Sequence, residues 1–189
     1  MSEGQHLLLR IRPERIERDD RLEAYRFLHY CVSALVEVYV GAVGHERVGV
    51  LSAAGVEGDV DTLEEALREL HHRRTSIVTP APLLVVVPTL LHLLHEEGDA
   101  IAAQRRRRVA VDLVSRGPQH RMHLVTGLTV EPPGLEQRAR AAAPASILSA
   151  VETIDLEGGA DLRPVFAVLA AFTGLDPRPE GIARALALL

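Results

Sequence analysis

The chain has 189 residues, 47% of them hydrophobic, and a formal net charge of -5 at pH 7. All 21 basic residues are arginine, which excludes a Schiff-base lysine, a pyridoxal-phosphate attachment point and a P-loop of the usual form. The negative charge disfavours a general nucleic-acid binder, and the single cysteine, Cys31, excludes an internal disulfide and a multi-cysteine zinc site.

Composition also indicates the source and the compartment. Lysine and asparagine, whose codons are AT-rich, do not occur in the chain, so the sequence indicates a bacterium with a GC-rich genome. The N-terminal apolar run is too short for a signal peptide, and Pro88 and His92 interrupt the apolar run at 83–94. We therefore expect a cytoplasmic protein without a membrane segment.

The first half of the chain predicts alternating strands and helices. A short apolar run bounded by proline predicts a strand at 6–13, and apolar residues at helical spacing predict a helix from Asp19 or Asp20. The segments 36–43 and 47–55 are rich in β-branched residues and predict a hairpin. The segment 55–59 is interpreted as a loop. A capping-box pattern then predicts a helix from Asp61, and the apolar run at 83–87 predicts a buried strand.

This order is typical of the ferredoxin-like, split βαβ arrangement, so the predicted class is α+β. After Pro88 we expect a helix that Thr89 caps and that runs toward Gln104, and then a second hairpin from 108–117 and 120–130. The prolines and glycine near 131–134 predict a boundary. The expected organisation is a domain at 1–130, a linker at 131–145 and a C-terminal helical extension at 146–189, packed on the domain or on a partner subunit.

The segment LLHLLHEEGD, residues 90–99, concentrates histidines and acids. On a helix, the four residues His92, His95, Glu96 and Asp99 fall within one arc of about 100°, opposite the apolar positions. Imidazole and carboxylate groups at this spacing suit Zn²⁺ or another divalent metal, but the order is not that of an HExxH motif. We expect the water-facing side of an amphipathic helix, with a metal site as the alternative, and no other cofactor is predicted.

A run of four arginines, Arg105, Arg106, Arg107 and Arg108, lies where the predicted helix gives way to the predicted strand. Guanidinium groups bind phosphate or an acidic partner through paired hydrogen bonds. Charge complementation at a helix end explains the same run, and no aromatic residues accompany it. The four arginines are candidates for an anion or partner contact, and a nucleic acid is not expected.

The sequence contains neither GxSxG nor a GxGxxG motif that opens a helix, and DLEGGAD lacks the glutamate that an EF-hand requires. We therefore predict a non-catalytic protein-interaction or regulatory module of a bacterial cytosolic system, one that self-associates or binds another protein. The alternative is a small-molecule binding protein, or a metal-assisted enzyme that uses the histidine and carboxylate face.

Overall fold

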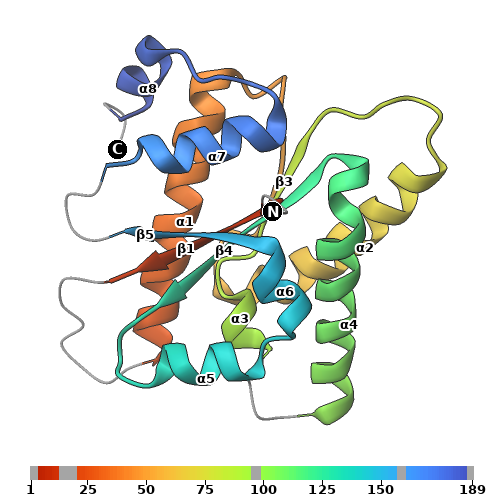
Figure 1. The fold of residues 1–189 in the computed structure, drawn as a ribbon, viewed down its shortest axis with the longest axis vertical. Helices are drawn as coiled ribbons and strands as arrows, with labels where there is room; N and C mark the ends of the chain where they lie inside the picture. The colour runs from red at the N-terminus through yellow and green to blue at the C-terminus, as the bar shows by residue number, and fades with distance from the viewer. Residues whose placement is uncertain (1–3, 13–20, 95–98, 157–160, 187–189) are drawn as a thin grey trace.

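The computed structural model describes residues 4–12, 21–94, 99–156 and 161–186. A five-stranded sheet with strand order β2-β3-β4-β1-β5 forms its centre (Figure 1). Every hydrogen-bonded pair of strands is parallel. The strands are β1 (His6–Ile11), β2 (Gly49–Ser52), β3 (Leu83–Val86), β4 (Met122–Thr129) and β5 (Val151–Leu156).

Eight α-helices are assigned within the described residues, and α2 and α4 lie side by side (Figure 1). They are α1 (Arg21–Val43), α2 (Asp59–Thr75), α3 (Leu90–Leu93), α4 (Ala100–Arg116), α5 (Leu135–Ala142), α6 (Ala145–Ala150), α7 (Arg163–Thr173) and α8 (Pro179–Leu186). Two buried clusters, one on each face of the sheet, form the core. One joins the sheet to α1 and α7, and the other joins it to the helices from α2 to α6.

The strand order explains why the helices divide between two faces. From β1 the chain crosses through α1 to β2 at the far edge of the sheet, whereas from β4 it crosses through α5 and α6 past β1 to β5. Parallel crossovers are right-handed, so connections that run in opposite directions lie on opposite faces. The direction reverses between the neighbouring strands β4 and β1, which makes this pair the topological switch point of the sheet.

Close packing of α1 against β4 depends on one glycine. A Cβ atom on Gly127 would lie 2.6 Å from the Cδ1 atom of Leu28 and 2.9 Å from the Cγ2 atom of Val32. Only a residue without a side chain allows this approach of helix to strand. Gly127 therefore sets the position of α1 over the carboxyl half of β4.

The mixed helix and strand character that the sequence predicted is confirmed, but the ferredoxin-like order is not. A ferredoxin-like sheet is antiparallel, whereas this one is parallel. The predicted hairpin at 36–43 and 47–55 is wrong, because residues 36–43 complete α1 and only Gly49–Ser52 forms a strand. β-propensity reflects packing on a half-buried surface, and a buried helix offers the same packing to valine.

The second predicted hairpin is also wrong in its first strand. Residues 108–116 belong to α4, in which Val109, Ala110, Leu113 and Val114 are buried at helical spacing. The predicted strands at 6–13 and 83–87 and the predicted helix from Asp61 correspond to β1, β3 and α2.

The last part of the chain contributes to the same sheet as the first. The segment 131–145, predicted as a linker, contains α5. The first part of the segment 146–189, predicted as a helical extension, contains the end of α6 and the strand β5. β5 pairs with β1 along its full length. The predicted boundaries at 130 and 146 stay a prediction.

Helix α1 has the length and apolar composition of a membrane span, and no other helix in the described ranges does. In the structure, residues such as Leu28, Val32 and Tyr39 of α1 are buried against the sheet and its neighbours. The core helix of a soluble protein passes the same test, so α1 indicates no location.

Candidate functional site

Polar side chains gather at the carboxyl ends of β2 and β3, next to the switch point. In open parallel α/β sheets, ligands bind outside the carboxyl ends of the strands and near the switch point. The polar groups here come from the first half of α1, the start of α2 and the residue that precedes α3. We call His29, Asp59 and Thr89 the carboxyl-edge cluster.

Asp59, the first residue of α2, is the centre of the carboxyl-edge cluster, and it has no exposed surface. Its Oδ2 atom accepts two hydrogen bonds from Thr89, one from the backbone N–H at 3.0 Å and one from Oγ1–H at 2.6 Å. Hydrogen bonds to a charged acceptor are stronger than neutral ones. Asp59 therefore fastens the start of α2 to the end of β3.

The second oxygen of Asp59 faces His29 of α1. The Nε2 atom of His29 lies 3.3 Å from Oδ1, and the two side chains are 8% and 0% exposed. This distance is that of an ion pair, but the atoms are not aligned for a hydrogen bond, so neither has a hydrogen-bond partner in the described part of the chain. Buried polar atoms are nearly always satisfied. Within the described residues, each of these two atoms therefore has only the other as a polar partner.

Two aromatic rings extend the cluster. Tyr25 lies one helical turn before His29, and its ring centroid is 4.7 Å from that of His92 on α3. His92 is only 1% exposed, so the prediction that it faces water is wrong. The expected continuous helix does not form, because α3 ends at Leu93 and α4 begins at Ala100.

Two of the four predicted metal ligands lie on different elements, because His92 belongs to α3 and Asp99 precedes α4. Asp99 is exposed and caps α4, where its Oδ1 atom accepts the N–H of Ile101 at 2.9 Å. His95 and Glu96 lie outside the described residues. Within the described ranges, no group of three or more histidine, cysteine or acidic side chains could hold a metal ion. The site formed by His92, His95, Glu96 and Asp99 stays a prediction.

A charged network lies on the opposite face at the end of β1. Arg10 donates two hydrogen bonds to the carboxylate of Glu136 on α5, at 2.9 and 3.0 Å, and one to Asp155 on β5 at 2.9 Å. Arg140 donates to the same Glu136 carboxylate at 2.9 Å. The Arg10 hydrogen bonds hold the pKa of Glu136 below its usual value, against the opposing effect of burial. This network is charge-balanced, and it ties α5 and β5 to β1.

The four arginines lie in the middle of α4 rather than at its end, which corrects their predicted position. Arg105 pairs with Glu64 of α2 at 3.1 Å, and Arg107 donates to the carbonyl oxygen of Leu94 at 3.1 Å. Arg106 is half-buried, and Arg108 is exposed. Two of the four therefore hold α4 to its neighbours, and their role as an anion or partner contact stays a prediction.

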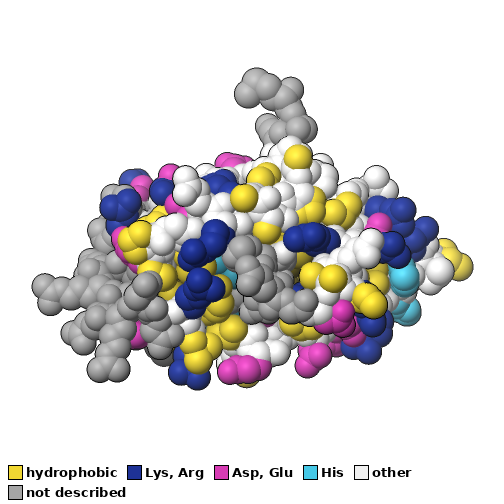
Figure 2. Space-filling model, turned by 90° about the horizontal axis from the view of Figure 1, so that it is seen from below, with side chains coloured by type: hydrophobic (Ala, Val, Ile, Leu, Met, Phe, Trp, Pro, Cys, Tyr) yellow, Lys and Arg dark blue, Asp and Glu magenta, His cyan; other side chains and the backbone are white. Residues whose placement is uncertain are grey.

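Figure 2 shows the molecule from the end where α1 and α4 begin and where α5 lies. Basic, acidic and apolar side chains are interspersed there, with no broad surface of one charge. Nonspecific binding to a polyanion depends on a broad basic surface. This face therefore offers no support for nucleic-acid binding.

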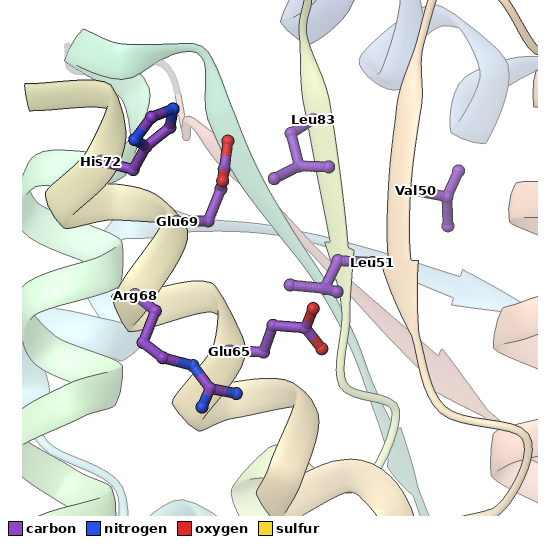
Figure 3. A pocket seen from close by; sticks show the side chains of 7 residues that line it. All are labelled: Val50, Leu51, Glu65, Arg68, Glu69, His72 and Leu83. Atoms are coloured by element: carbon purple, nitrogen blue, oxygen red, sulfur yellow. The ribbon is translucent and has the colours of Figure 1, made fainter. Parts of the chain in front are cut away.

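A cavity of about 430 Å³ lies between α2 and the strands β2 and β3. Figure 3 shows Leu51 and Leu83 pointing toward α2, from which Glu65 points back toward the strands. Glu69 also lines this cavity, but its carboxylate is held by Arg73 at 2.6 Å. A larger cavity of about 930 Å³ lies at the amino ends of β1, β4 and β5.

Comparison of the chain with protein-family models, curated proteins and solved structures found no match. The candidate site therefore depends on its own geometry. Sequence reasoning missed the carboxyl-edge cluster, because its members are 30 positions apart in each step from His29 to Asp59 to Thr89. The available signal was a polar residue, Thr89, that follows the proline after a buried strand.

Proposed function

We propose that the protein binds a small polar molecule at the carboxyl edge of its sheet, with His29 and Asp59 as the polar contacts. The observation that carries this proposal is the buried contact between Nε2 of His29 and Oδ1 of Asp59, two atoms that lie 3.3 Å apart and make no hydrogen bond within the described residues, beside the switch point of a parallel sheet. Buried groups of this kind at the strand ends of an α/β fold favour a ligand site over a purely structural contact. The small-molecule alternative from the sequence thus becomes the leading proposal.

The two facing atoms define what the ligand must offer. A carboxylate oxygen only accepts hydrogen bonds, whereas a histidine nitrogen donates or accepts according to its protonation. A hydroxyl or primary amide group can donate to Asp59 and also bond to His29. We therefore expect a small alcohol or amide, with the ring of Tyr25 or His92 as an adjacent apolar wall.

The test is a nuclear magnetic resonance screen with a set of small amides, alcohols and polyols. The backbone N–H of Thr89 is the reporter, since it bonds directly to Asp59. We expect a ligand that shifts the Thr89 signal in the natural protein and not in a His29→Leu variant. The matched control is His71→Leu on the exposed side of α2, which should leave the shift intact. Ligands that shift Thr89 equally in His29→Leu would contradict the proposal.

A second candidate function is the predicted self-associating interaction module. Exposed apolar side chains favour it, since Tyr30 on α1 is 66% exposed and Ile77 in the loop after α2 is 102% exposed. Exposed apolar side chains mark interaction surfaces when they adjoin one another, and Ile77 is followed by Val78, which is 75% exposed. Analytical ultracentrifugation tests this candidate: we expect an oligomer that Tyr30→Ser or Ile77→Ser weakens, and a monomer at all concentrations would contradict it.

A further inference from the structure

We infer that the cavity at the amino ends of the strands is a second binding site, which takes a primary amine carried on a short apolar body. The cavity measures about 930 Å³ and lies between α7 and the amino ends of the strands β1, β4 and β5. This edge of the sheet is opposite the carboxyl-edge cluster. Its volume falls within the usual range of small-molecule sites, which is roughly 300–1,000 Å³.

The orientation of His123 on β4 is the first observation. Its Nδ1 atom lies 2.9 Å from the carbonyl oxygen of Gln5. A carbonyl only accepts hydrogen bonds, so Nδ1 carries the proton and Nε2 carries a lone pair. Nε2 makes no hydrogen bond within the described residues and is not one of the buried unpaired atoms, so it is accessible from the cavity that His123 lines.

The ring of His123 is held in place on both sides. It stacks on Phe172 of α7 with ring centroids 4.9 Å apart and an angle of 7° between the planes. The ring centroid of His6, on the neighbouring strand β1, lies 6.3 Å from that of His123. Burial lowers the pKa of His123, which favours the neutral ring with its acceptor nitrogen. The cavity therefore presents a fixed hydrogen-bond acceptor.

The charge of the cavity wall favours a cationic ligand. Glu152 is the one charged side chain among the described residues that line the cavity. Arg121 acts on His123 through space, but its guanidinium group bonds to the carbonyl oxygens of Pro80 and Thr173 and does not line the cavity. A protonated amine in the cavity can donate to Nε2 of His123 and is attracted by the charge of Glu152, whereas an anion would be repelled by Glu152.

The remaining wall requires an apolar body. Ala167, Val168, Ala171 and Phe172 of α7 line one side of the cavity. A wholly apolar ligand would leave Nε2 of His123 without a partner, and an inorganic cation would leave the α7 side unfilled. An amine on a short aromatic or aliphatic body satisfies both parts of the cavity.

The experiment is a calorimetric titration with phenylethylamine and its neutral counterpart phenylethanol. We expect the amine to bind the natural protein at least tenfold more tightly than the alcohol, since a hydrogen bond to a charged group is worth about 1.5–3 kcal/mol. Glu152→Gln, an exposed position, should remove this preference, and His123→Phe should weaken the amine while it retains the ring. Glu37→Gln on the exposed side of α1 is the control and should bind normally.

Three results would overturn the inference. They are an alcohol that binds as tightly as the amine, unchanged amine binding by Glu152→Gln, and no amine binding at millimolar concentration. The Thr89 amide signal separates this site from the carboxyl-edge cluster, because phenylethylamine in the amino-edge cavity should leave that signal in place. Glu152→Gln keeps the test valid even where His123→Phe fails to fold.

Discussion

Replacement of Asp59 by alanine tests the carboxyl-edge cluster through stability. The substitution leaves two buried donors of Thr89, its N–H and its Oγ1–H, without their acceptor. A buried donor that loses its acceptor costs about 1–3 kcal/mol, so the two donors together cost about 2–6 kcal/mol. A change of 1 kcal/mol shifts the melting temperature by roughly 2–4 °C in a domain of this size. We therefore expect Asp59→Ala to lower the melting temperature by roughly 4–24 °C.

The assay is thermal unfolding followed by circular dichroism, with urea unfolding to obtain the free energy. Asp61→Ala is the matched control, because Asp61 lies in the same first turn of α2 but is exposed. It loses only an interaction with the helix dipole, which is worth about 0.3–1 kcal/mol. Equal loss of stability in Asp59→Ala and Asp61→Ala would refute the reasoning that Asp59 fastens α2 to β3.

Three further predictions concern stability and reactivity. His6 donates from Nε2 to the Val114 carbonyl and accepts the Leu124 N–H, and burial lowers its pKa from 6.5 to about 4. The unfolded chain therefore binds a proton first as the pH falls through 6.5. Urea unfolding should show a loss of about 2 kcal/mol between pH 7 and pH 5 that His6→Gln removes, and a variant with the same pH slope would contradict this. Gly127→Ala should cost about 1–3 kcal/mol in thermal unfolding through overpacking against α1, and an unchanged melting temperature would count against it. Burial raises the pKa of Cys31, so iodoacetamide should modify this thiol more slowly than free cysteine at pH 7, and an equal rate would disagree.

The strands that the sequence predicted correctly share a simple signature. β1 and β3 are short apolar runs, each followed by a proline that cannot continue a regular element. Both are also buried along their lengths, as inner parallel strands are. Such segments can be predicted from the sequence, because both their length and their boundaries are typical of a strand.

The last third of α1 could not be recognised as a helix for a physical reason. Val36, Val38, Tyr39 and Val40 are all buried, although they point in different directions around the helix. The sheet covers one side of α1 and α8 contacts it as well. A helix that is covered on more than one side loses the apolar periodicity on which sequence interpretation depends.

The candidate site could not be predicted from the sequence, because only the crossover connections between strands bring its residues together. Asp59 lies in a segment interpreted as a loop, and Thr89 was expected only as a helix cap, while His29 is a lone histidine beside an apolar face. Nothing in the local pattern joins them. The strand order places the ends of β2 and β3 beside α1, and only then do the three side chains meet.

Native mass spectrometry of the untagged protein, purified gently from its own host, tests the central claim most directly. We expect the natural protein to retain a small molecule of defined mass, and we expect His29→Leu to lack it while His71→Leu keeps it. A natural protein that carries no small molecule, or a His29→Leu variant that retains the same molecule, would contradict a ligand site at the carboxyl edge of the sheet.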